Sequence, residues 1–129
     1  MMPRSPSKTP SSRRVAAYRQ GHRGEAMAAL WLQLKFYRIL ERRFKTPMGE
    51  IDLVAEKGST VVFVEVKQRA LNADEALTFA AINRSRIARA AQLWLAQNPD
   101  ALGRDFRFDV ILLAPGRWPR HLINAFPAS

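Results

Sequence analysis

The sequence contains no cysteine and only two histidines, His22 and His121, among its 129 residues. The absence of cysteine excludes disulfide bonds and thiolate-ligated zinc, and two isolated histidines do not make a histidine-rich metal site. Neither histidine has a visible partner in the sequence, so we assign neither a role. A metal bound by this chain must therefore be held by oxygen ligands.

Long apolar runs are also missing. No segment approaches the roughly 20 apolar residues that span a bilayer, and the N-terminus lacks the apolar stretch of a signal peptide. Apolar residues make up 47% of the chain and charged residues 25%, as in ordinary globular proteins. We expect a cytoplasmic protein with no membrane partner, and the length suits one domain with a hydrophobic core.

Acidic residues are absent from residues 1–23, which carry six arginines and lysines. The chain has a formal charge of +10, so the remainder carries fifteen basic and eleven acidic residues, or +4. The basic segment could bind nucleic acid by releasing counterions, or serve as a solvated arm that aids solubility. Residues 1–14 contain three prolines and four serines, which predicts disorder. We predict a disordered tail over 1–17 and a single domain over 18–129.

Hydrophobic periodicity predicts the element order α-β-β-β-α-β. Residues 24–36 are rich in alanine and leucine and predict the first helix. Ala26, Leu30 and Leu34 stand at i, i+4 and i+8, so we expect them to form its apolar face. Glu25 then lies in the first turn of this helix.

Runs of β-branched and aromatic residues predict the strands. They cover residues 37–44, 49–56, 60–67 and 106–113, with a further edge strand over 121–126. Residues 76–97 predict one long helix, with Ile87, Ala91 and either Trp94 or Leu95 at helical spacing. Asn98-Pro99 ends this pattern, because the residue before a proline disfavours helical geometry.

The strands over 49–56 and 60–67 predict a hairpin with polar pairs on both arms. Side chains alternate along a strand, so Glu50 and Asp52 share one face, as do Glu65 and Lys67. If Gly58-Ser59 forms a two-residue turn, the numbers of paired residues sum to 117, and Asp52 faces Glu65 while Glu50 faces Lys67. Facing Cβ atoms lie about 4.5–5.5 Å apart, close enough for two carboxylates to share one cation.

Two neighbouring carboxylates in an apolar hairpin repel each other unless a cation compensates. Mg²⁺ or Mn²⁺ accepts a few carboxylates together with water and phosphate oxygens, and it promotes phosphodiester cleavage. Lys67 would then orient or deprotonate the attacking water, and Glu25 would supply a third carboxylate. The tripeptide Glu65-Val-Lys67 alone is weak evidence, since exposed strands often carry Glu–Lys pairs. An aspartate between Ile51 and Leu53 that faces a glutamate between valines is harder to explain structurally.

The arrangement Asp-(x)n-Glu-x-Lys on a hairpin resembles the PD-(D/E)xK nuclease superfamily. Four motifs more closely resemble the YraN-like family of small bacterial proteins: Arg23-Gly-Glu-Ala26, Gly49-Glu-Ile-Asp-Leu53, Phe63-Val-Glu-Val-Lys67-Gln-Arg69 and Arg107-Phe-Asp-Val110. This resemblance implies an α/β fold with a mixed β-sheet flanked by helices and a restriction-endonuclease-like core. It also implies that the positions of the catalytic site are Glu25, Asp52, Glu65 and Lys67.

The leading hypothesis is therefore a magnesium-dependent endonuclease that hydrolyses phosphodiester bonds in DNA, branched or damaged DNA included. The alternative is a non-catalytic nucleic-acid-binding or assembly module with a nuclease-like fold, and a third is an RNA- or ribosome-associated factor. Cutting two strands often needs a second subunit, so a homodimer is considered. Candidate contacts to nucleic acid are Arg69, Arg84, Arg86 and Arg89, although a solvated helix face explains the last three equally well.

Four further residues have two interpretations each. Trp31, Trp94 and Trp118 are more often core or edge-packing residues than platforms on which bases stack. Asp109 stands in an apolar strand, where it either supports the site from behind or is a buried, hydrogen-bonded group.

Overall fold

The computed structural model describes residues 24–70 and 74–127. The predicted tail over 1–17 and His22 lie outside these ranges. Within them, no helix has both the length and the apolar character needed to cross a bilayer.

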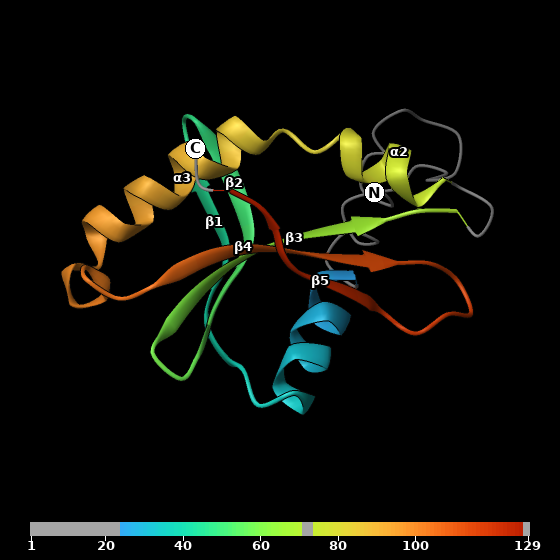
Figure 1. The fold of residues 1–129 in the computed structure, drawn as a ribbon, viewed down its shortest axis with the longest axis horizontal. Coiled ribbons are helices and arrows are strands. Elements are labelled where there is room, and N and C mark those ends of the chain that lie inside the picture. The colour runs from blue at the N-terminus through green and yellow to red at the C-terminus, as the bar shows by residue number, and fades with distance from the viewer. Residues whose placement is uncertain (1–23, 71–73, 128–129) are drawn as a thin grey trace, which may run out of the picture.

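A mixed sheet of five strands in the order β1-β2-β3-β4-β5 forms the centre of the molecule (Figure 1). Its strands are β1 (Arg38–Thr46), β2 (Gly49–Lys57), β3 (Thr60–Gln68), β4 (Phe106–Leu113) and β5 (Arg120–Phe126). The β3–β4 pair is parallel and the other three pairs are antiparallel. This confirms the predicted α/β class with a mixed sheet, and β5 is the expected edge strand.

The predicted hairpin has the expected register. Leu53 pairs with Val64, and the pairing continues to Lys57 and Thr60, so paired numbers sum to 117. Gly58 has a φ of 59°, the left-handed conformation that glycine adopts readily in a two-residue turn. The pairing of β2 with β3 reaches only to Leu53 and Val64, whereas β3 stays paired with β4 as far as Gln68.

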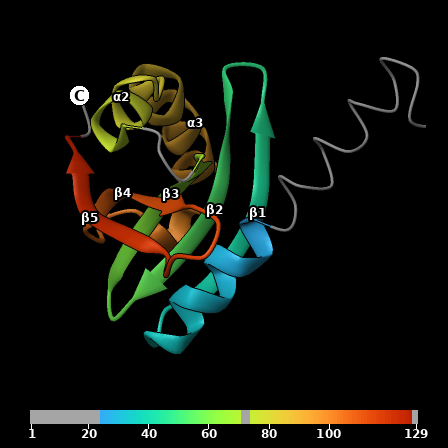
Figure 2. The ribbon, with the colours of Figure 1, turned by 90° about the vertical axis from the view of Figure 1, so that its right-hand side faces the viewer.

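Helices cover both faces of the sheet (Figure 2). An N-terminal helix over 24–34 packs on one face. The helix α3 (Arg84–Gln97) packs on the other, where Ile87 and Ala91 are buried and Trp94, rather than Leu95, is the third buried residue. Two apolar cores therefore lie back to back, one on each side of the sheet.

The predicted apolar face of the N-terminal helix was wrong. Leu30 is 56% exposed and Leu34 is 66% exposed, and Ala26 is exposed as well. The residues buried against the sheet are Ala28, Ala29 and Leu32, each at 0%. The physical reason is proximity: small alanine side chains let the helix backbone lie close to the sheet, so the alanine face packs inward.

The single long helix predicted over 76–97 is also wrong, because the structure divides it into α2 (Glu75–Ala80) and α3. Asn83 accepts a hydrogen bond on its side-chain oxygen from the Arg86 N–H at 3.2 Å and thereby starts α3. Asp74 caps α2 in the same way, through the Ala76 N–H at 2.8 Å. A short 3-10 helix, η2 (Pro99–Ala101), follows α3.

Candidate functional site

The acid pair predicted on the hairpin lies where β2 separates from β3. Asp52 is the residue before the last β2–β3 pair, and its Oδ2 atom accepts a hydrogen bond from the Val66 N–H at 2.7 Å. A side-chain carboxylate thus bonds the backbone of β3 beyond the point where the paired ladder of the two strands ends. This bond fixes the orientation of Asp52 beside Glu65, the acid on β3.

Glu65 is hydrogen-bonded to Asp52, as the pairing sum predicted. Burial, this hydrogen bond and the negative charge of Asp52 raise the pKa of Glu65 to about 9, while the charge of Lys67 opposes the shift. Glu65 is therefore protonated at neutral pH, and the pair shares one proton. This proton removes the repulsion expected between two adjacent carboxylates.

Lys67 lies on the same face of β3 as Glu65, at the more open side of the acid pair. Its Nζ atom is 3.8 Å from Glu65 Oε2, and its side chain is 39% exposed. The ammonium group is thus close to the acids and also accessible to an incoming anion. A phosphate group is the kind of anion that a lysine in this position can bind.

Glu25 enters the same electrostatic cluster from the N-terminal helix. It is 7% exposed, and burial raises its pKa; the charge of Arg43 opposes this, and that of Asp52 reinforces it. Arg43 Nε lies 3.6 Å from Glu25 Oε2. Arg43 has a φ of 51° within β1, a strained conformation of the sort that gathers at functional sites. No local pattern in the sequence marks this arginine, since nothing nearby predicts a positive φ for a non-glycine residue.

The donor set fits a magnesium ion only in part. Among residues 24–70 and 74–127, no three His, Cys, Asp or Glu side chains are grouped closely enough to hold a metal. Glu25 therefore does not complete the predicted three-ligand group. Asp52 and Glu65, however, bring their carboxyl oxygens into hydrogen-bond contact, and magnesium is commonly held by one or two carboxylates plus water and phosphate. The chain thus fits a two-carboxylate site.

The predicted arginines occupy two places. Arg84, Arg86 and Arg89 are exposed at the start of α3. Arg86 Nε donates to the Met48 carbonyl at 3.0 Å, and the Arg84 guanidinium lies 4.9 Å from the Phe79 ring centroid. Arg69 instead follows directly after β3, and its Nη2 atom is 3.6 Å from Glu75 Oε2. Of the four arginines, Arg69 is therefore the one that directly follows the strand of Glu65 and Lys67.

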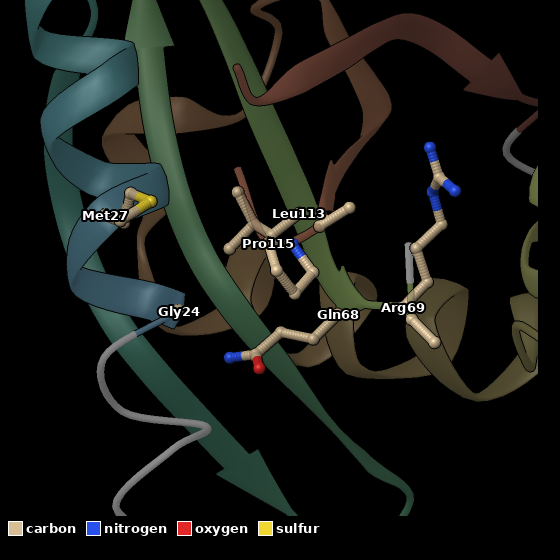
Figure 3. Close-up of a pocket in the computed structure, with 8 residues that line it drawn as sticks. Gly24, Met27, Gln68, Arg69, Leu113 and Pro115 are labelled. Carbon is tan, nitrogen blue, oxygen red and sulfur yellow. The ribbon is translucent and has the colours of Figure 1, made fainter. Parts of the chain in front are cut away.

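A hollow of about 590 Å³ opens beside the ends of β3 and β4 (Figure 3). Its lining includes Gly24, Met27, Gln68 and Pro115. Figure 3 shows Gln68 extending toward Gly24, where a Cβ atom would lie 2.2 Å from Gln68 Nε2. A larger residue at position 24 would therefore have to displace the flexible end of the Gln68 side chain.

Asp109 is a buried, hydrogen-bonded group. It is 0% exposed, and it accepts hydrogen bonds from Arg107 Nε at 2.9 Å and from the Asn124 N–H at 2.9 Å. His121 Nε2 lies 2.7 Å from its Oδ2 atom. Asp109 pairs with Val64, so it belongs to the face opposite that of Glu65. Sequence reasoning missed His121 because its partners come from distant segments.

The chain is similar to a family of bacterial proteins. The model of the family described as "Uncharacterised protein family UPF0102" matches residues 24–113. A UPF0102 protein of Rhodopseudomonas palustris (strain BisB5) is 50% identical over 126 residues, covering 98% of this chain and 96% of the relative. One from Bradyrhizobium sp. (strain ORS 278) is 52% identical over 124 residues, covering 96% and 88%. The chain therefore belongs to the UPF0102 family, the YraN-like proteins that its four motifs resemble.

Proposed function

We propose that this protein is a metal-dependent endonuclease that hydrolyses phosphodiester bonds in DNA. The observation that carries the proposal is the contact between Asp52 and Glu65, with the Lys67 ammonium 3.8 Å from Glu65. Two carboxylates and one amine lie where β2 separates from β3. They form a donor set suited to a divalent cation and a phosphate.

The residues of the site have separate roles in this proposal. Asp52 and Glu65 would hold a magnesium or manganese ion, which when bound supplies Lewis-acid activation of water and of the phosphate. The Val66 N–H keeps Asp52 in place. Glu65 must lose its proton before its oxygens can act as ligands. Lys67 orients the attacking water or offsets the negative charge that develops on the phosphate.

A non-catalytic nucleic-acid-binding module is the second candidate. It is favoured by the raised pKa of Glu65, because a protonated Glu65 relieves the repulsion from Asp52 without a cation. In this case the acids would be a structural element that closes the hairpin where β2 leaves β3.

A cleavage assay separates the two candidates. The full-length protein is incubated with a panel of single-stranded, duplex and branched DNA and RNA, with Mg²⁺, with Mn²⁺ and with a chelator. We expect cleavage only with metal, with Asp52→Asn and Lys67→Ala both inactive. Asp100→Asn, at an exposed position on η2, is the matched control and should remain active. Activity in the chelator would exclude the metal mechanism.

Thermal unfolding of the same variants distinguishes ligand from structural roles. We expect Asp52→Asn to leave metal-free stability unchanged or slightly raised, because the amide oxygen still accepts from Val66 and the amide N–H₂ can donate to Glu65. It should abolish stabilisation by magnesium, whereas Lys67→Ala should retain it. A metal-free destabilisation of Asp52→Asn by several kcal/mol, of the kind seen when a buried polar network is broken, would make Asp52 structural.

A further inference from the structure

The parallel strands β3 and β4 end at the same edge of the sheet, and a second hollow of about 740 Å³ lies there. It shares Arg69, Ala114 and Pro115 with the hollow of Figure 3. The two hollows therefore adjoin at the strand ends, and we call them together the carboxyl-end groove. In open α/β sheets, ligands bind outside the carboxyl ends of the parallel strands.

An exposed aromatic side chain stands in this groove. Trp118 lies in the connection between β4 and β5 and is 81% exposed. Its ring centroid is 5.7 Å from that of Trp31 on the N-terminal helix, with 34° between the ring planes. Contact with Trp31 therefore covers little of the Trp118 side chain. Most of the indole is available to a ligand with a flat face.

The groove is also basic. Among the described residues, Arg69, Arg117 and Arg120 line it together with one acid, Glu75. Glu75 lies 2.7 Å from Arg120 Nε and 3.6 Å from Arg69 Nη2, so it neutralises part of this charge. The Arg120 side chain is still 62% exposed, and Arg117 makes no ion pair within the described ranges. Net positive charge beside an open aromatic ring suits phosphates alternating with bases.

The groove begins close to Lys67 along the chain, because Gln68 and Arg69 line it. Arg69 follows Lys67 by two residues, directly after the end of β3. Leu112, which lines the groove, is the β4 residue that pairs with Lys67. A chain of phosphates lying in the groove would thus continue toward Lys67.

We propose that the carboxyl-end groove binds an unpaired nucleic-acid strand, with one base stacked on Trp118 and phosphates held by Arg117 and Arg120. An unpaired base offers a free face to an indole, whereas bases in a duplex already stack on their neighbours. One consequence rests on the proposed function: the substrate is a nucleic acid with a single-stranded segment next to the bond that is cut.

Binding is tested without metal, so that cleavage plays no part. Fluorescence anisotropy in a chelator compares a labelled oligothymidine, an oligouridine and a blunt DNA hairpin on the full-length protein. We expect Trp118→Ala to weaken binding of the unpaired strand by about tenfold, Trp118→Phe to retain most of it, and hairpin binding to change little. Leu102→Ala, at a position 60% exposed, is the apolar control and should bind like wild type. The two oligonucleotides show whether the groove prefers DNA or RNA.

Salt dependence tests the arginines. Arg117→Ala should reduce the slope of log affinity against log salt by about 0.7, the value for one lost contact to a single strand. Arg38→Ala, which removes the same charge beside Glu56 near the start of β3, should leave the slope unchanged.

Five outcomes decide the proposal. Wild-type affinity of Trp118→Ala for the unpaired strand would overturn it, as would an equal loss for strand and hairpin. A change in oligomeric state on light scattering, with oligonucleotide binding unchanged, would assign Trp118 to a protein contact and also overturn it. If binding depends on Trp118 but no metal supports cleavage, the groove proposal is supported and the nuclease proposal is contradicted. If the protein cleaves but binding does not depend on Trp118, the nuclease proposal is supported and the groove proposal is contradicted.

Discussion

At the scale of single residues, the raised pKa of Glu65 makes the stability of the metal-free protein depend on pH. The pKa is about 9 in the folded chain against an ordinary 4.5, so the folded state binds an extra proton between these values. Stability should therefore fall as pH rises from about 5 to about 9, by at most ~1.4 kcal/mol per pH unit from this group. Glu65→Gln should remove that slope in urea unfolding measured across the range. Equal slopes for wild type and variant would contradict a shared proton.

The same residues show how far a candidate site can be predicted from sequence. The meeting of Asp52 with Glu65 follows from strand alternation and from the turn at Gly58, both of which are local rules. The contact between Glu25 and Arg43 depends on where a helix packs against β1 and on a positive φ. Neither is encoded in a short stretch of sequence, so Arg43 could not be anticipated.

At the scale of elements, the N-terminal helix depends on small residues at its buried face. Ala28 is 0% exposed against the sheet, while Ala26 on the same helix is exposed. We expect Ala28→Leu to lower the free energy of unfolding by about 1–3 kcal/mol through overpacking. Ala26→Leu adds the same atoms at an exposed position and should change it by less than about 0.5 kcal/mol. Chemical denaturation measures both, and equal effects would show that the alanine face does not determine the packing.

The two elements that were predicted incorrectly failed for related reasons. Periodicity selects the largest apolar residues as the buried face, but the distance between helix and sheet selects the alanines instead. In the second case, helix-favouring residues continue through 76–97, and the caps Asp74 and Asn83 that divide the segment act by single hydrogen bonds. The strands were more predictable, because β-branched runs bounded by glycine and proline mark them locally.

At the scale of the whole molecule, one buried network joins segments from both halves of the chain. His121 on β5 approaches Asp109 on β4, and its Nδ1 atom lies 2.7 Å from the Lys35 ammonium after the N-terminal helix. With Nε2 protonated, the imidazole donates to Asp109 and accepts from Lys35. The network thereby ties β5, and with it the loop that carries Trp118, to the sheet and to the opposite layer.

Asp109→Asn tests whether this network stabilises the fold. Burial would raise the pKa of Asp109, but the hydrogen bonds from His121, Arg107 and the Asn124 N–H outweigh it and hold the pKa below the ordinary 3.8. In Asp109→Asn an amide N–H₂ group replaces one acceptor oxygen and faces the groups that donate to Asp109. We therefore expect the free energy of unfolding to fall by roughly 3–5 kcal/mol at neutral pH. Because the folded pKa is depressed, the ionised carboxylate contributes fully above pH 3.8, and its contribution is lost as pH falls through the folded value.

The difference in the free energy of unfolding between wild type and Asp109→Asn should therefore be constant from neutral pH down to about pH 4. Below about pH 4 this difference should become smaller. Denaturant unfolding across that range measures it, with Asp100→Asn on η2 as a control that keeps wild-type stability at neutral pH. Loss of nucleic-acid binding in Asp109→Asn while it is still folded would show that the network also positions the Trp118 loop. A variant as stable as wild type at neutral pH would mean that Asp109 is replaceable and that the strand pairing of β4 with β5 holds the edge by itself.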